Sequence, residues 1–223
     1  GGTVDAWFLT HAHDDHTGAF TRIVDNQNIN IKNIYVSLNN IEWYETYEPN
    51  RADFSKQLIE ILNRTDLKEK VKSPDLNEII NIDGIKIEIL GIKNPEIVEN
   101  AGNEQSMVMK FETGKTSLLI LGDTGKKSSE KLLNTQKSKL KSDIVQVSHH
   151  GQDGATKELY ETINPSICLW PTPDYLWNND NGEGENTGPW KTFETRNWME
   201  QLKVEKNIIE KDGDVTITIK YKG

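Results

Sequence analysis

Three apolar segments of this chain each end abruptly in residues of the kind that bind metal ions. The apolar run at 7–10 leads into the sequence HAHDDH at 11–16. The run at 118–121 leads into Gly122 and Asp123, and the run at 144–148 leads into His149 and His150. Strand ends on one rim of a sheet are rigid points from which side chains can converge, as a metal site requires. We therefore expect a sheet whose strands bring these three segments together.

All five histidines of the chain lie in these segments, a concentration that random scattering would rarely produce. Imidazole nitrogen and carboxylate oxygen suit Zn²⁺, Fe and Mn. His11 and His13, two residues apart in a turn after a strand, can bind one ion. Asp15 and His16 can face a neighbouring ion, and Asp123 could bridge the two. A lone Asp in a loop is more often a solvated residue or a helix cap, so the prediction depends on the whole set.

The length and charge of the chain restrict the remaining possibilities. Its 223 residues, 35% of them hydrophobic, suit one globular domain with a sizeable core. The net charge of −9 disfavours a broad nucleic-acid surface, although a local basic strip or a bound metal would override that average. No run approaches the ~18 apolar residues of a membrane span. The single cysteine, Cys168, excludes an intrachain disulfide and is expected to be buried.

Periodicity predicts a mixture of hairpins and helices. Hairpins are expected at 79–90, turning at Asp83 and Gly84, and at 106–121, turning at Gly114. Helices are expected at 15–24, 50–63, 128–133, 157–163 and 190–202, with a long loop at 171–188. The segment 208–221 is expected to be a further hairpin, turning at 212–213. This mixture predicts an α/β (α+β) fold with layered strands and helices outside.

The HAHDDH run resembles the His-x-His-x-Asp-His signature of the metallo-β-lactamase superfamily, whose fold is an αββα sandwich. The motifs follow in the family's order over nearly the whole chain. The segments 103–106, 119–123, 148–151 and 163–165 are similar to a narrower group. That group contains the hydrolase domain of the ComEC DNA-uptake proteins and the phosphorylcholine esterases of Gram-positive surfaces.

Residue by residue, the resemblance implies two metal sites. His11 and His13 would bind the first ion, Asp15 and His16 the second, and Asp123 would bridge them. One histidine of the pair at 149–150 would complete the second site. His150 is preferred because it precedes a glycine, as is frequent in the superfamily. His149 would then contact the scissile group or shuttle a proton, and the reverse assignment stays open.

The sequence departs from the family pattern in two ways. No histidine lies between His16 and His149, where many members place a further metal ligand. Asn103 or water would then fill the vacancy at the first metal, which argues against a β-lactamase or a thioesterase. Only ten residues precede His11, whereas members begin with strands well upstream. We therefore expect one domain over 1–223 without its first strands, which could be cleaved, disordered or supplied by another chain. The compartment, cytoplasmic or extracytoplasmic, is left open.

The resemblance implies hydrolysis by a hydroxide held between two divalent metals ~3.5–4 Å apart, with Asp15 orienting it. Zinc is the expected metal, with Mn or Fe as alternatives. A phosphoester or phosphodiester of a small molecule or surface polymer is the expected substrate. One alternative is a degenerate module that binds metal or ligand without turnover. The other is a ComEC-like nuclease, which the acidic balance disfavours.

The loop at 171–190 is the expected substrate wall. It contains Tyr175, Trp177 and Trp190 among several acidic residues. Aromatic faces beside acids suit a cationic ligand such as choline, through cation–π attraction. The more common alternative is that these aromatic side chains cover an edge of the core.

Overall fold

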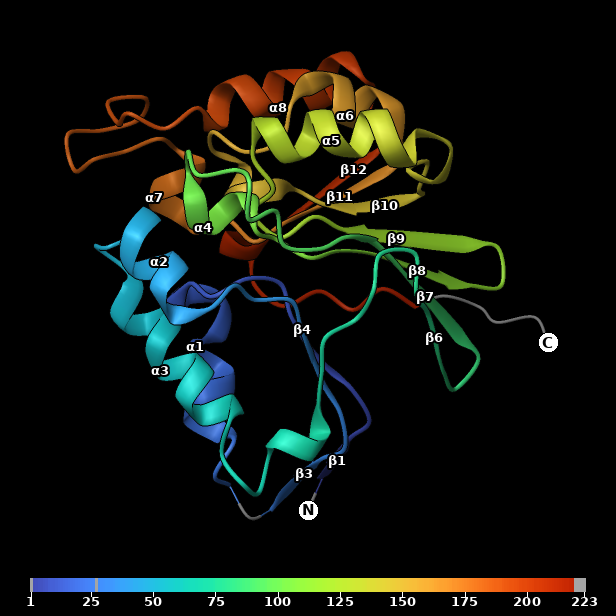
Figure 1. Ribbon diagram of the computed structural model, residues 1–223. Helices are drawn as coiled ribbons and strands as arrows, with labels where there is room; N and C mark the ends of the chain where they lie inside the picture. The colour runs from blue at the N-terminus through green and yellow to red at the C-terminus, as the bar shows by residue number, and fades with distance from the viewer. Residues whose placement is uncertain (1, 27, 219–223) are drawn as a thin grey trace.

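The computed structural model describes residues 2–26 and 28–218, and its largest element is a seven-stranded mixed sheet (Figure 1). Its strands lie in the order β12-β11-β10-β9-β8-β7-β6. The antiparallel part contains β6 (Ile79–Ile82), β7 (Ile85–Gly91), β8 (Val108–Thr113) and β9 (Thr116–Ile120). The part that runs parallel to β9 contains β10 (Ile144–Gln146), β11 (Ile167–Trp170) and β12 (Lys206–Ile209).

Two smaller groups of strands form the opposite layer, and all of their pairs are parallel. One is a three-stranded sheet of β2 (Trp7–Leu9), β4 (Ile34–Val36) and β5 (Val71–Lys72). The other pairs β1 (Gly2–Val4) with β3 (Ile29–Ile31).

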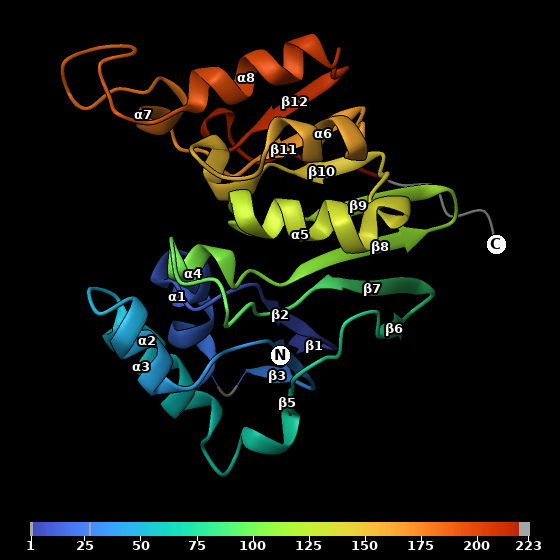
Figure 2. The same ribbon diagram turned by 45° about the horizontal axis from the view of Figure 1, so that its top comes forward.

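Helices cover the outer sides of both layers, as Figures 1 and 2 show. The large sheet carries α5 (Lys126–Gln136), α6 (Lys157–Ile163) and α8 (Thr192–Gln201). The smaller strands carry α1 (Asp14–Ile23), α2 (Ile41–Tyr47) and α3 (Ala52–Leu62). Short helices α4 (Ala101–Glu104) and α7 (Asp174–Trp177) lie in loops, with 3-10 turns at Lys68–Lys70, Lys137–Lys139, Ser148–Gly151 and Glu210–Asp212. This confirms the predicted order of helix, sheet, sheet and helix.

Apolar side chains between the two sheets hold the layers together. Phe8 of β2 stacks on Tyr35 of β4 with ring centroids 4.8 Å apart. Phe8 also meets Phe111 of β8 edge-on at 5.8 Å, which joins the small sheet to the large one. Buried Ile87 and Met109 belong to the same cluster. Because aromatic rings remove large apolar areas from water, this cluster fixes how the two layers face each other.

Most of the predicted elements are confirmed, but the end of the chain is a correction. Both hairpins form, and Asp83 and Gly84 have the positive φ values (47° and 80°) that a tight two-residue turn requires. The predicted C-terminal hairpin is wrong within the described residues: β12 pairs in parallel with β11, and residues 213–218 form no strand. Alternating Val215 and Ile217 suggested a strand, yet both are exposed and lack a core to face. Residues 219–221 of that prediction lie outside the described part.

Two further observations concern burial and length of helices. Cys168 is a buried free thiol, as expected. Over the described ranges 2–26 and 28–218, no helix is both long enough and apolar enough to cross a membrane.

Candidate metal centre

The potential ligands come from the ends of strands in both sheets. β2 ends at Leu9, one residue short of the HAHDDH run, whose last three residues open α1. β9 and β10 are parallel neighbours, so Asp123 and the histidine pair emerge at the same end of the large sheet. The two sheets are joined at this point, because the Met107 amide donates to the Thr10 carbonyl at 2.8 Å. The predicted convergence of three separate segments is therefore present.

The turn that carries Asp123 is tightly held. Gly122 has a φ of +57°, and a Cβ there would lie 2.9 Å from Ser106 Oγ and 3.0 Å from Thr10 Cβ. The amides of Leu121 and Gly122 donate to the Gln146 side-chain oxygen at 3.0 and 2.8 Å. The Asp123 amide donates to Ser106 Oγ at 2.9 Å. A left-handed glycine and two polar side chains thus aim the carboxylate into the site.

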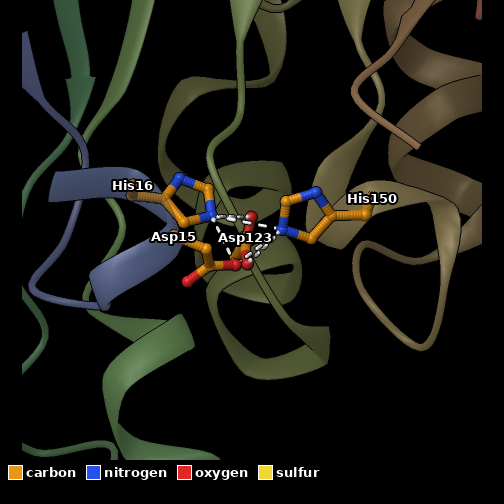
Figure 3. A group of neighbouring side chains, drawn as sticks. All are labelled: Asp15, His16, Asp123 and His150. Atoms are coloured by element: carbon orange, nitrogen blue, oxygen red, sulfur yellow. Dashed lines mark hydrogen bonds and ion pairs between the residues drawn. The ribbon is translucent and has the colours of Figure 1, made fainter. Parts of the chain in front are cut away.

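The second metal group consists of Asp15, His16, Asp123 and His150, and Figure 3 shows these side chains pointing toward one another. His16 Nε2 lies 3.1 Å from Asp123 Oδ1, and His150 Nε2 lies 3.1 Å from Asp15 Oδ2. The two imidazole Nε2 atoms are 3.3 Å apart. Ligands on a tetrahedral zinc with bonds of ~2.05 Å are ~3.3 Å from each other. The spacing of the four donor atoms therefore fits a shared cation.

The first metal group consists of His11, His13 and Asp123, all buried. His11 Nε2 and Asp123 Oδ2 are 3.8 Å apart. His11 Nε2 and Asp123 Oδ1 are buried and have no partner in hydrogen-bonding geometry, as also holds for Glu48 Oε2 and Asn103 Oδ1 nearby. Leaving a buried polar atom unpaired costs about 1–3 kcal/mol. A cation at this group would satisfy the imidazole and carboxylate atoms, so the residues fit a further ion that shares Asp123.

Hydrogen bonds orient two of the imidazoles. His150 Nδ1 donates to the Pro171 carbonyl at 2.7 Å, which directs its Nε2 toward the group. His11 Nδ1 lies 3.2 Å from Thr10 Oγ1 and 3.3 Å from Ser106 Oγ. Outer hydrogen bonds of this kind fix the ring and the tautomer of metal-binding histidines.

The carboxylates give the centre an affinity for positive charge. Burial raises the pKa of Asp123, but the close imidazoles of His16, His11 and His150 outweigh it and keep that pKa well below its usual range. The hydrogen bond from His150 likewise lowers the pKa of Asp15. Burial lowers the pKa of His150, yet Asp15 and Asp123 together raise it to about 9. His11 is different, since burial lowers its pKa well below the usual value and keeps it neutral.

A family model described as the metallo-β-lactamase superfamily matches residues 1–215. The chain belongs to the metallo-β-lactamase superfamily. Such proteins are metal-dependent hydrolases, and this member carries a His/Asp cluster with room for two divalent ions. The resemblance inferred from the HAHDDH run is confirmed.

Two curated relatives are similar over part of their length. The chain is 24% identical over 168 residues to ComE operon protein 3 of Bacillus subtilis (strain 168), which covers 74% of this chain and 20% of that protein. It is 30% identical over 128 residues to recombination protein 2 of Haemophilus influenzae, which covers 57% of this chain and 14% of that protein. The chain thus spans about a fifth or less of the relatives it matches.

Solved structures show the same fold at low identity. Unliganded yeast PDE1 has a TM-score of 0.52 and 13% identity, covering 92% of this chain and 66% of that one. The metallo-β-lactamase fold protein YhfI from Bacillus subtilis has a TM-score of 0.50 and 12% identity, covering 92% and 74%. These matches confirm the sandwich architecture of the superfamily member described above.

His149 was the other candidate of the histidine pair. His149 is outside both groups: its Nδ1 donates to the Asp153 carbonyl at 3.1 Å, and Asn103 Nδ2 donates to its Nε2 at 3.2 Å. Burial lowers the pKa of His149, so the ring is neutral at pH 7. His149 and His150 both have left-handed backbone angles, with φ of 50° and 54°. Such strain in non-glycine residues is frequent at functional sites.

Of the three predicted aromatic residues of the substrate wall, Tyr175 and Trp190 contact each other and Trp177 packs elsewhere. Tyr175 lines a cleft of about 540 Å³ together with Asp15 and His150. Trp190 meets the edge of Tyr175, with centroids 5.5 Å apart. Trp177 packs on Trp170 at 5.2 Å, and the guanidinium of Arg196 covers its ring at 4.3 Å. Of the three, only Tyr175 lines that cleft.

Sequence reasoning missed two charged residues of the centre. Glu48 Oε1 lies 2.7 Å from His13 Nε2, and Arg51 lines the cleft beside Asp15. Both follow α2 in a segment with no motif, so nothing local in the sequence marks them. The packing of α3 against α1, and of α2 against α3 and α4, brings this segment to the metal groups.

Proposed function

We propose that this superfamily member hydrolyses phosphoesters or phosphodiesters with two bound divalent metals, most favourably zinc. The observation that carries the proposal is the pair of donor groups that share Asp123, with His11 Nε2 and Asp123 Oδ1 buried and unpaired between them. Well-packed proteins rarely leave such atoms without partners unless a ligand supplies them.

In this proposal the two groups hold one ion each. His11, His13 and Asp123 hold the first, and Asp15, His16, His150 and the shared Asp123 hold the second. When bound, two such cations lower the pKa of water and neutralise charge that develops on a phosphoryl group. The chain itself supplies a rigid frame, because the donors stand on strand ends and at the start of α1.

Arg51 supports a phosphoryl substrate. Its guanidinium lies in the same cleft as Asp15 and His150, 3.9 Å from Asp15 Oδ1 and 3.5 Å from Asp14 Oδ1. Guanidinium forks match the oxygens of phosphate well. With Asp15 engaged in the metal group, Arg51 would bind and orient a non-bridging oxygen of the ester.

In this proposal His149 moves a proton at the edge of the centre. Its Nδ1 is anchored on the Asp153 carbonyl, and its Nε2 accepts from Asn103. A neutral imidazole with a fixed tautomer can exchange the Asn103 contact for an oxygen of the substrate. We therefore assign Asn103 to holding His149 and Tyr175 to the wall of the cleft.

Metal analysis combined with turnover tests the proposal. The purified chain should hold two equivalents of metal and hydrolyse bis-p-nitrophenyl phosphate or p-nitrophenyl-phosphorylcholine, with loss on chelation. Asp123→Asn should lose metal and turnover, whereas the exposed Asp53→Asn on α3 is a matched control that should retain both. Absence of bound metal would overturn the proposal. Metal without turnover on any ester would instead favour a binding module.

A nucleic-acid phosphodiester is the second candidate substrate. It is favoured by the two curated relatives, one of which is named a recombination protein. The net charge of −9 and Glu210 in the cleft oppose it. Cleavage of single-stranded DNA with Mn²⁺, lost in Asp123→Asn, would establish it.

A further inference from the structure

Glu48 is the acidic side chain that contacts the first metal group from outside it. It follows α2 directly, and its amide donates to the Tyr44 carbonyl at 2.8 Å. Tyr44 is fully buried and anchors the end of the helix. The Glu48 side chain is 15% exposed, and its Oε2 is buried without a hydrogen-bond partner. The helix end therefore holds a carboxylate in the interior, beside His13.

The contact between Glu48 and His13 has the length of a hydrogen bond. Oε1 and Nε2 are 2.7 Å apart, which matches a charge-assisted N–H···O bond. Two ligands on one tetrahedral zinc would lie ~3.3 Å apart. Glu48 also lies outside the set of donor atoms that are close enough together to share an ion. These observations favour an outer partner of His13 over a further direct ligand.

We propose that Glu48 is the positioning residue of the first metal site. The inference rests on the proposed function. By accepting a hydrogen bond from Nε2–H of His13, Glu48 fixes the tautomer in which Nδ1 carries the lone pair. That nitrogen is the one left to bind the ion shared with His11 and Asp123. The arrangement strengthens His13 as a ligand and adds negative charge beside a site that lacks the family's further histidine.

The backbone of α4 closes over this pair. A Cβ at Gly102 would overlap His13 Nε2 and both carboxylate oxygens of Glu48. Only a glycine permits this approach, so His13 and Glu48 are confined between α4 and the end of α2. The carboxylate is therefore held in one place, as positioning the imidazole requires.

Zinc affinity of the intact chain tests the inference, measured by competition with a chromophoric chelator. A His150→Ala background removes a donor of the other group and isolates the first site. In that background, Glu48→Ala should raise the zinc Kd about 10- to 100-fold, the usual effect of removing such a partner. Glu48→Gln keeps an acceptor oxygen and should restore part of the loss. Glu45→Gln, an exposed change on the same helix, is the matched control and should leave the Kd unchanged.

Two further readouts separate positioning from general stability. Nitrogen-15 NMR of the histidine rings should show the zinc-loaded His13 protonated at Nε2, with this signal lost in Glu48→Ala. The unfolding temperature of the metal-free protein should change far less than the Kd. An unchanged zinc Kd in Glu48→Ala would overturn the role of Glu48 while leaving the hydrolase proposal intact. A wild-type chain that binds no zinc would overturn both.

Discussion

Gly122→Ala is expected to damage the centre through steric contact, and Gly114→Ala offers a closely matched control. The two glycines have nearly equal φ values, +57° and +58°. A Cβ at Gly114, in the β8–β9 turn, would meet nothing within 4 Å. Gly114→Ala should therefore lose only the stability that a left-handed alanine costs, about 1–2 kcal/mol.

At Gly122 the added methyl also meets neighbours that cannot easily move. It would lie 2.9 Å from Ser106 Oγ, the atom that accepts from the Asp123 amide and also contacts His11 Nδ1. Overpacking of this kind costs a further ~1–3 kcal/mol. For a chain of this size the difference between the variants corresponds to about 2–12 °C in unfolding temperature.

The assay compares both metal-free variants by urea and thermal unfolding and then counts their zinc equivalents. Gly122→Ala should be the less stable variant and should lose zinc, because Asp123 and His11 shift together. Gly114→Ala should keep wild-type zinc. Equal stabilities for the two variants, with zinc retained in both, would refute the reasoning.

Three other outcomes are expected. Gly102→Ala should lower zinc occupancy because its methyl overlaps the His13–Glu48 pair, whereas Gly18→Ala, with open space around it in α1, should keep zinc and gain up to about 1 kcal/mol of stability. Arg51→Ala should raise KM for phosphodiesters about tenfold or more while metal content measured by mass spectrometry stays at wild type, because one charge-assisted contact to phosphate is lost. Burial raises the pKa of Glu88, but hydrogen bonds from Lys139 and Lys86 outweigh it and lower that pKa. The ionised Glu88 therefore stabilises the fold above its unfolded pKa of ~4.3, and this stabilisation is lost as the pH falls through the folded pKa. The stability difference between wild type and Glu88→Gln in urea unfolding should therefore narrow on acidification, and a constant difference would contradict this.

The candidate metal ligands could be predicted from the sequence because each set of them follows a strand. The HAHDDH run, Gly122-Asp123 and the histidine pair each follow an apolar strand, so strand ends and donors could be predicted together. The hairpins at 79–90 and 106–121 were predictable because their turn residues interrupt alternating apolar patterns.

The remainder depended on tertiary packing. Glu48 lies 35 residues beyond His13, and its place beside the imidazole arises from how α2 packs under α4. Trp177 was predicted to form the substrate wall with Tyr175 because both are aromatic residues of the same loop. In the structure Trp177 packs on Trp170 instead. The alternating pattern near Val215 suggested a strand, although β12 had already taken the edge of the sheet beside β11.

The centre draws His11, His13 and His16 from the small-sheet half and Asp123 and His150 from the large-sheet half. Ions bound there would cross-link the two halves of the molecule. They would add to the contacts between the sheets that Phe8 and Phe111 already make. Ligand at a hundredfold excess over its Kd adds about 2.7 kcal/mol to folding stability. The folding stability of the chain would then depend on the concentration of available metal. Loss of metal would therefore weaken the packing of the two layers as well as abolish activity.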